Sequence, residues 1–142
     1  MASLQFAHIG LSCQDPLAVE RFYSKHFGFR RARVVSLGAE QVVYIKSGGV
    51  CLELFQAKGE APVPPAGGAG PEYPGWRHLA FQVDDVAAKL EAMGEEAKIT
   101  LGPLRFDDFI PGWRTVWLSD PEGNIVEVSQ GYRDQENPPP LT

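Results

Sequence analysis

The stretch Val50-Cys51-Leu52-Glu53-Leu54-Phe55-Gln56 places a single carboxylate, Glu53, within an apolar run. A carboxylate in the middle of a strand is costly to bury unless another group pairs with it. The same pattern returns at Asn124-Ile125-Val126-Glu127-Val128-Ser129-Gln130, with Glu127 in the matching place. A glycine immediately precedes each run, Gly49 before the first and Gly123 before the second. The repetition indicates that the chain contains two modules of the same design.

A pair of histidines repeats in the same way. His8 lies in the run Phe6-Ala7-His8-Ile9-Gly10-Leu11, and His78 lies in the similar run Trp76-Arg77-His78-Leu79-Ala80-Phe81. In each module, a histidine on an early strand is therefore followed by a glutamate on a late strand. The remaining histidine, His26, has no counterpart in the second half, and we do not expect it to belong to this set.

The pattern of apolar residues predicts one α+β domain over residues 1–142, in which each module is a strand, a helix and three further strands. Module 1 covers residues 4–56 and module 2 covers residues 76–130. A linker rich in proline and glycine, residues 57–75, should contain no regular element. Residues 131–142 should form a flexible tail. The expected strands are 4–13, 30–37, 41–46, 50–56, 76–83, 97–101, 113–119 and 124–130, and the expected helices are 17–27 and 86–93.

The four repeated polar residues should face one side of the sheet. Each glutamate stands between two apolar residues that should face the core, and each histidine lies on the opposite side of its strand from its apolar neighbours. His8, Glu53, His78 and Glu127 should then face the concave side, away from the helices. Two imidazoles and two carboxylates suit one divalent transition metal, such as Zn, Ni, Co, Mn or Fe. Two open positions on a six-coordinate metal would make the site catalytic.

The composition excludes several classes of function. The formal net charge is −5, and no cluster of Lys and Arg suits a nucleic acid or a membrane surface. No apolar run approaches the roughly 20 residues of a membrane span, and the residues after Met1 do not resemble a signal peptide. Cys13 and Cys51 lie within apolar strands and should be buried thiols in a reducing compartment. We therefore expect a cytoplasmic protein.

The chain from residue 4 to residue 130 resembles the vicinal oxygen chelate superfamily, which includes glyoxalase I, methylmalonyl-CoA epimerase, extradiol dioxygenases, and fosfomycin- and bleomycin-resistance proteins. The motifs that carry the resemblance are His8-Ile9-Gly10-Leu11, Phe22-Tyr23 with Gly28-Phe29, Leu52-Glu53-Leu54, His78-Leu79-Ala80-Phe81 with Val83-Asp84-Asp85, and Asp120-Pro121-Glu122-Gly123-Asn124 before Glu127. The resemblance implies tandem βαβββ modules that form a cupped, eight-stranded mixed sheet around a metal.

Among these families, the order His, Glu, His, Glu is that of glyoxalase I. The resemblance implies a metal-dependent isomerase or lyase that moves a proton on a small substrate chelated through vicinal oxygens. Glu127 would be the first candidate for the base, and Glu53 its counterpart. The alternatives are an Fe(II) extradiol-type dioxygenase, for which Glu53 would be a surplus ligand, and a metal-independent protein that sequesters a drug or metabolite.

The residues that hold glutathione in glyoxalase I are not found here. Ser12 stands where that family usually has an arginine, and Gln56, Ala57 and Lys58 stand where it usually has an asparagine. The resemblance therefore predicts the chemistry of glyoxalase I more strongly than its substrate.

Four further residues are candidates for binding the substrate. Trp117 alternates with Val116 and Leu118 and could share a face with Glu127. Arg105, Trp113 and Arg114 lie in or after the loop expected at residues 102–112, where an arginine could hold a carboxylate or phosphate. We also expect a homodimer, and the linker is long enough for a site within one chain or between two.

Overall fold

The computed structural model describes residues 3–142, and the chain divides into two compact units. The first unit holds the chain up to Pro65 together with the turn Asp120–Gly123. The second unit holds Ala66–Ser119 and Asn124–Thr142. Each unit contains one of the two repeated modules.

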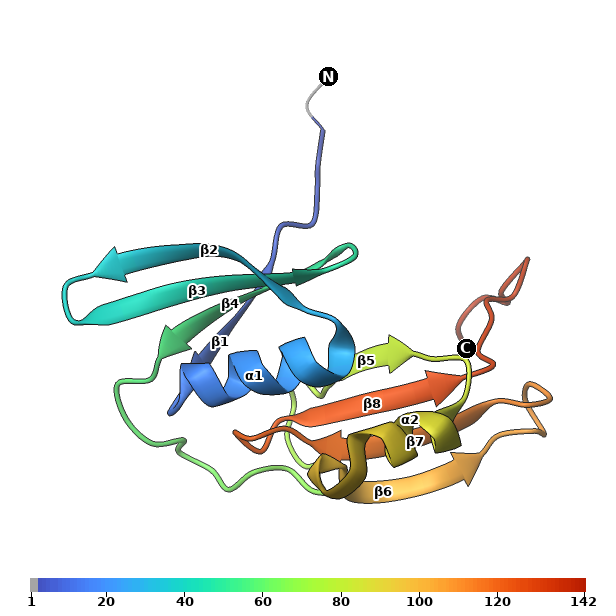
Figure 1. The fold of residues 1–142 in the computed structure, drawn as a ribbon. Helices are drawn as coiled ribbons and strands as arrows, with labels where there is room; N and C mark the ends of the chain where they lie inside the picture. The colour runs from blue at the N-terminus through green and yellow to red at the C-terminus, as the bar shows by residue number, and fades with distance from the viewer. Residues whose placement is uncertain (1–2) are drawn as a thin grey trace. The chain divides into compact units, whose positions relative to one another are not determined.

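The first unit is built on a four-stranded sheet (Figure 1). Its order along the sheet is β1-β4-β3-β2, with β1 parallel to β4 and the other pairs antiparallel. The helix α1 packs against β1, β3 and β4. The bounds of its elements are β1 (Ile9–Cys13), α1 (Pro16–Phe27), β2 (Arg30–Leu37), β3 (Glu40–Ser47) and β4 (Val50–Gln56).

The second unit repeats this topology. Its sheet has the order β5-β8-β7-β6, again with one parallel pair between the first and last strands of the module. The prediction of two βαβββ modules in an α+β fold is thus confirmed, and the eight strands form two sheets of four. The bounds are β5 (Leu79–Gln82), α2 (Val86–Met93), a 3-10 turn η1 (Gly94–Glu96), β6 (Lys98–Arg105), β7 (Arg114–Ser119) and β8 (Ile125–Gln130).

Three strand boundaries differ from the prediction by more than one residue. The first strand of each module starts later than expected, at Ile9 and at Leu79, because its pairing with the last strand of the module begins there. Before that point Leu4 and Phe6 are exposed. Strand β6, by contrast, continues to Arg105, into the segment expected to be a loop. It does so through irregular register, with shifts on both sides of Leu101 that accommodate Pro103.

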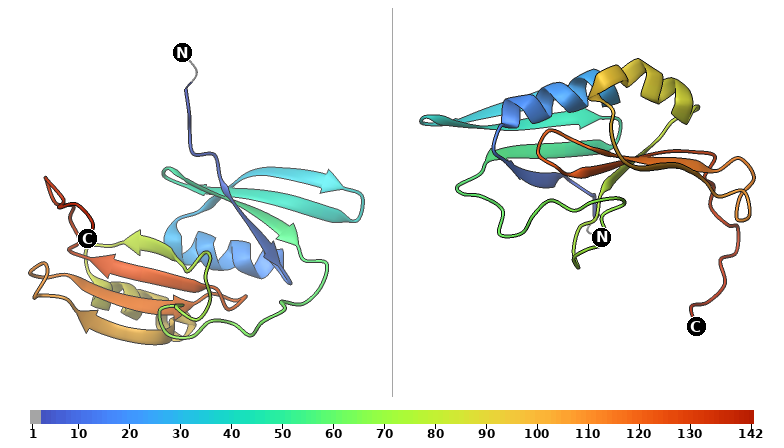
Figure 2. Two further views of the ribbon diagram at one scale, coloured as in Figure 1. Left: turned by 180° about the vertical axis from the view of Figure 1, so that it is seen from behind. Right: turned by 90° about the horizontal axis from the view of Figure 1, so that it is seen from below.

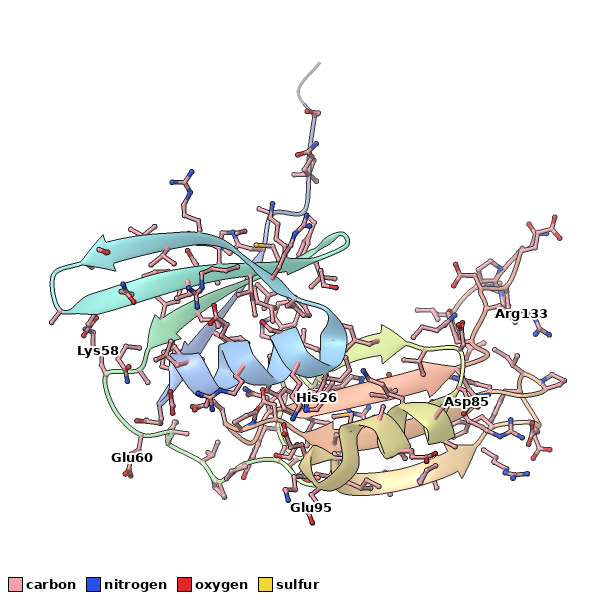
Figure 3. All side chains as sticks on the ribbon, in the orientation of Figure 1. His26, Lys58, Glu60, Asp85, Glu95 and Arg133 are labelled. Atoms are coloured by element: carbon pink, nitrogen blue, oxygen red, sulfur yellow. The ribbon has the colours of Figure 1, made fainter. Side chains whose placement is uncertain are left out.

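Both helices begin at an aspartate, as the sequence indicates. The side chain of Asp15 accepts a hydrogen bond from the backbone N–H of Ala18. Asp85, labelled in Figure 3, caps α2 in the same way through Ala88. These caps satisfy N–H groups that the first helical turn leaves unpaired, and they direct each helix back across its own sheet.

The fully buried residues of the last strand in each module face the helix of that module. In the first unit, Leu52 and Leu54 of β4 are fully buried, as are Val19 and Tyr23 of α1. In the second, Val126 and Val128 of β8 are fully buried on the side of α2. Because side chains alternate along a strand, the residue between each pair, Glu53 or Glu127, faces away from the helix.

The linker and the tail contain no helix or strand within the described chain. Residues 57–75 run without regular structure, as their composition predicts, and so do residues 76–78, which were expected to begin a strand. Residues 131–142 leave β8 as an extended segment (Figure 2). Neither of the helices found in residues 3–142 has the length and apolar character needed to cross a membrane.

Candidate metal centre

In the first unit, β4 places Glu53 beside His8. Glu53 lies opposite Gly10 of β1 and opposite Tyr44 of β3. His8 precedes β1 by one residue, and its Nε2 atom lies 3.2 Å from Oε1 of Glu53. The second carboxylate oxygen, Oε2, accepts a hydrogen bond from the hydroxyl of Tyr44. The Glu53 side chain is only 13% exposed, so these two partners compensate most of its lost hydration.

The second unit repeats this arrangement with His78 and Glu127. Glu127 of β8 lies opposite Ala80 of β5, and Nε2 of His78 lies 3.4 Å from Oε2 of Glu127. Both side chains are about four-fifths buried. The residues that adjoin the two glutamates across the parallel pairs, Gly10 and Ala80, are both small.

A backbone carbonyl of the linker orients His78. The carbonyl oxygen of Ala69 lies 3.3 Å from Nδ1 of His78 and accepts a second hydrogen bond from Nε of Arg77 at 2.6 Å. A carbonyl can only accept, so Nδ1 carries the proton and donates it. In the neutral imidazole, Nε2 then has a free lone pair directed toward Glu127. Histidines that bind metals are commonly held in this way through their other nitrogen.

The geometry of the pairs fits a shared divalent metal. Two neighbouring ligands on one ion lie about 3 Å apart when each metal–ligand bond is about 2.1 Å long. The nitrogen–oxygen separations of 3.2 and 3.4 Å are close to this value. The donor set, imidazole nitrogen with carboxylate oxygen, suits first-row transition metals. Each pair can therefore supply two ligands to a metal.

The four candidate ligands fall into two groups. His8 and Glu53 belong to the first unit, whereas His78 and Glu127 belong to the second. Within residues 3–142, no group of three or more histidine, cysteine, aspartate or glutamate side chains is arranged to hold a metal. The structure thus brings the four residues together as two pairs, and their role as metal ligands stays a prediction.

Tyr44 is a member of the site that the sequence interpretation missed. The turn at Gly48-Gly49 joins β3 to β4, and counting outward from it in register places Tyr44 opposite Glu53. Counting in the same way from the preceding hairpin, which joins β2 to β3, places Arg33 of β2 opposite Tyr44. The hydrogen bond to Glu53 raises the pKa of Tyr44, with burial and the charge of Glu53 adding to the effect. The phenol therefore stays protonated and acts as a donor.

Trp117 occupies the place in β7 that Tyr44 occupies in β3. It lies opposite Glu127 in the antiparallel register, on the face that its alternation indicated. Trp117 is 7% exposed and packs with Ala69 and Ile125. Within the described residues, its buried Nε1 atom has no hydrogen-bond partner.

Trp113 lies near this face as well. Its Nε1 atom donates a hydrogen bond of 3.1 Å to Oγ of Ser129, which shares a face with Glu127. The partly buried Phe106 packs against the cluster around Trp117. Its ring also lies beside the ring of Trp113, with the two centroids 5.0 Å apart. Aromatic side chains therefore line the Glu127 side of the second sheet.

Arg105 and Arg114 lie opposite each other at the end of the β6–β7 pair. Arg114 also pairs in register with Gln130, whose side chain accepts a hydrogen bond from the first residue of α2. Together with Asp84, Asp85 and residues of α2, they line a cavity of about 400 Å³. The structure therefore places both arginines on the α2 face of the second sheet, whereas Glu127 lies on the other face.

A comparison with known families agrees with this arrangement. The sequence model of the Glyoxalase/Bleomycin resistance protein/Dioxygenase superfamily matches residues 5–128. The chain belongs to this superfamily. The match covers both histidine–glutamate pairs, from His8 to Glu127, and confirms the resemblance found in the sequence.

The chain also resembles individual proteins over nearly their whole length. The chain is 30% identical to the uncharacterized protein YaeR of Escherichia coli, over 87% of this chain and 94% of YaeR. It is 29% identical to the uncharacterized protein YwkD of Bacillus subtilis, over 85% and 92% of the two chains. Among solved structures, a glyoxalase family protein from Enterococcus faecalis matches with a TM-score of 0.67 and 27% identity, over 88% and 96%.

Proposed function

We propose that this protein is a metal-dependent isomerase or lyase of the glyoxalase type. It would move a proton on a small substrate that carries oxygen atoms on adjacent carbons. The observation that carries this proposal is the repeated histidine–glutamate pair, with nitrogen–oxygen separations of 3.2 and 3.4 Å in the two units. Membership of a superfamily named in part for glyoxalase supports it.

In this proposal, one divalent transition metal is held by His8, Glu53, His78 and Glu127. Two carboxylates balance the charge of the ion, and two neutral imidazoles add nitrogen donors. When bound, the metal would polarise the two oxygens of the substrate and make the neighbouring C–H bond more acidic. The protein is proposed to act as a homodimer.

The protein residues would carry the proton. We assign this task first to Glu127, with Glu53 as its counterpart. Its carboxylate would take the proton from one carbon as that C–H bond breaks, and return it to the adjacent carbon as a new C–H bond forms. The hydroxyl proton would pass from the oxygen on the first carbon to the oxygen on the second, so that the hydroxyl and carbonyl groups exchange places and no external oxidant or reductant is needed. Trp117 and Trp113 are proposed to form the wall of the substrate pocket, and an anion-binding role for Arg105 and Arg114 stays a prediction.

Metal analysis of protein purified without chelators tests the first step. We expect about one equivalent of a transition metal per site. Less than about a tenth of an equivalent that reconstitution with metal does not restore would overturn the proposal.

Proton exchange tests the catalytic step. Candidate 2-hydroxy carbonyl compounds and hemithioacetals are incubated with the metal-loaded protein in D₂O, and deuterium incorporation at carbon is followed by NMR. The wild type should exchange the proton, whereas Glu127→Gln should retain some metal and lose exchange. Full exchange in that variant would remove Glu127 as the base.

The same samples distinguish the other activities of the superfamily. A ring-cleaving dioxygenase would consume oxygen with a catechol in the presence of Fe(II), and would tolerate Glu53→Ala. A binding protein that needs no metal would retain tight ligand binding in His8→Ala. Either result would contradict the proposed reaction.

Mixing two inactive variants reveals which chains supply the ligands. If each site is built within one chain, a mixture of His8→Ala and His78→Ala regains no metal binding. If each site takes one pair from each of two chains, a mixed dimer contains one intact site. Refolding the two variants together from denaturant, followed by metal titration, distinguishes these arrangements.

A further inference from the structure

The two histidine–glutamate pairs differ in the side chain that lies opposite each glutamate. Tyr44 of β3 and Trp117 of β7 occupy the same place in the two modules, each directly opposite the glutamate of its own sheet. Tyr44 donates a hydrogen bond to Glu53. Trp117 has no hydroxyl group, and its Nε1 has no partner among the described residues. The two modules therefore repeat the candidate ligands, but only the first module repeats them with a hydrogen-bond donor opposite the glutamate.

In the first unit, three side chains fix one another. Oε2 of Glu53 accepts from Tyr44, which leaves Oε1 facing His8. The ring of Tyr44 also meets the ring of His8 edge to face, with centroids 5.7 Å apart and an interplanar angle of 86°. Rotation of the Glu53 carboxylate would break the hydrogen bond to Tyr44 and displace the oxygen that faces His8. Glu53 is thus restrained at both oxygens.

Glu127 has no comparable restraint. Within the described residues, its side chain has one hydrogen-bonding or ion-pair partner, His78 at 3.4 Å, and no hydroxyl group donates to it. A carboxylate that takes a proton from carbon must turn toward the substrate, and this motion breaks no hydrogen bond to a tyrosine. The glutamate opposite Trp117 is accordingly the one that can move.

We infer that Tyr44 is a positioning residue that keeps Glu53 fixed as a metal ligand and so leaves the movement of the proton to Glu127. The inference rests on the proposed function, because it assigns different tasks to the two glutamates of that site. Tyr44 acts through Glu53 and does not itself touch the reacting atoms. Hydrogen-bonding partners of this kind alter the affinity of a metal site by about 10- to 100-fold.

Binding of Co²⁺ provides a test that does not depend on turnover. Metal-free wild type, Tyr44→Phe and Tyr132→Phe are titrated with Co²⁺, and both the dissociation constant and the visible absorption spectrum of the bound ion are recorded. Tyr132→Phe is a matched control, since Tyr132 donates to the carboxylate of Asp134 on the tail. Tyr44→Phe should bind Co²⁺ about tenfold more weakly and change the spectrum, whereas Tyr132→Phe should match the wild type.

The outcomes separate the inference from the proposed function. If the wild type binds Co²⁺ and Tyr44→Phe has the same affinity and spectrum, the inference is wrong and the proposed function stands. If the wild type binds no Co²⁺, the proposed function fails as well. Tyr44→Phe keeps the aromatic ring, and its thermal unfolding is measured beside the titration. A weaker affinity and a changed spectrum with an unchanged midpoint exclude a loss of fold as the cause.

Discussion

The Nδ1 atom of His78 lies 3.3 Å from the carbonyl oxygen of Ala69, so a residue of the linker orients a candidate ligand of the second module. The linker is fixed at this place by further contacts. Gly68 accepts a hydrogen bond of 2.6 Å from the hydroxyl of Thr100, and Ala69 packs with Trp117 and Ile125. A segment without regular structure is thus part of the candidate site.

Gly70→Ala should disturb this contact. Gly70 has a φ of +85°, and a Cβ atom there would lie 3.0 Å from the carbonyl oxygen of Arg77. The left-handed conformation alone should cost about 1–2 kcal/mol of stability. We expect weaker Co²⁺ binding together with a lower urea midpoint. Gly59→Ala is the control, because a Cβ at Gly59 meets nothing within 4 Å. Equal Co²⁺ affinity in the two variants would contradict a role for the linker in orienting His78.

Tyr23→Phe should destabilise the first unit. The hydroxyl of Tyr23 donates a buried hydrogen bond of 2.8 Å to Asp120, and burial raises the pKa of Tyr23 so that it stays a donor. Asp120 also accepts from the backbone N–H of Glu122 within its own turn. Loss of the hydroxyl group should lower the free energy of unfolding by about 1–3 kcal/mol, as measured by urea unfolding. Tyr73→Phe, at an exposed tyrosine, should change stability little, and similar losses in both variants would refute the assignment.

Much of the site could be predicted because the repeat constrains it. One glutamate in an apolar strand is ambiguous. The same alternation around both Glu53 and Glu127, however, indicates that each glutamate lies on the face of its sheet that points away from the helix. The tight turn at Gly48-Gly49 also fixes a register, and Tyr44 could have been found by counting from it. Tyr44 is also the residue of the first module that matches Trp117, so the comparison of the two modules leads to it as well.

Other features could not be read from the sequence. Alternation from Trp117 already places Arg114 on the opposite face. The position of Arg105, by contrast, depends on register shifts in β6 that no sequence pattern predicts. The contact between Ala69 and His78 joins a linker to a strand and depends on tertiary packing alone. Likewise, β1 begins at Ile9 because its parallel pairing with β4 begins there, opposite Leu52, although the apolar alternation starts earlier.

Acid should remove the stabilising contact between α1 and β2. Arg31 binds Glu20 through two hydrogen bonds, of 2.6 and 2.7 Å, and this contact lowers the pKa of Glu20. A carboxylate with a lowered pKa stabilises the fold above its unfolded pKa, about 4.3, and loses that contribution as the pH falls through its folded pKa.

The wild type should therefore be more stable than Glu20→Gln at pH 7, and the difference should vanish as Glu20 becomes protonated. Urea unfolding of both proteins between pH 7 and about pH 3 measures it. Glu40→Gln removes the exposed pair with Lys58, the residue labelled in Figure 3, and should show a smaller difference at every pH, because exposed pairs contribute little. A difference between wild type and Glu20→Gln that does not change with pH would refute the assignment.

Cys13 should resist thiol reagents in the folded protein. The residue is fully buried, and burial raises the pKa of its thiol to about 12, with the charges of Glu122, Asp120 and Asp15 adding to the effect. At pH 8 only about one thiol in ten thousand is ionised, and the thiolate is the reactive form. In Cys51→Ser, modification by a thiol reagent should follow the unfolding rate and become rapid in urea. Modification without urea at the rate of a free cysteine would show that Cys13 is accessible.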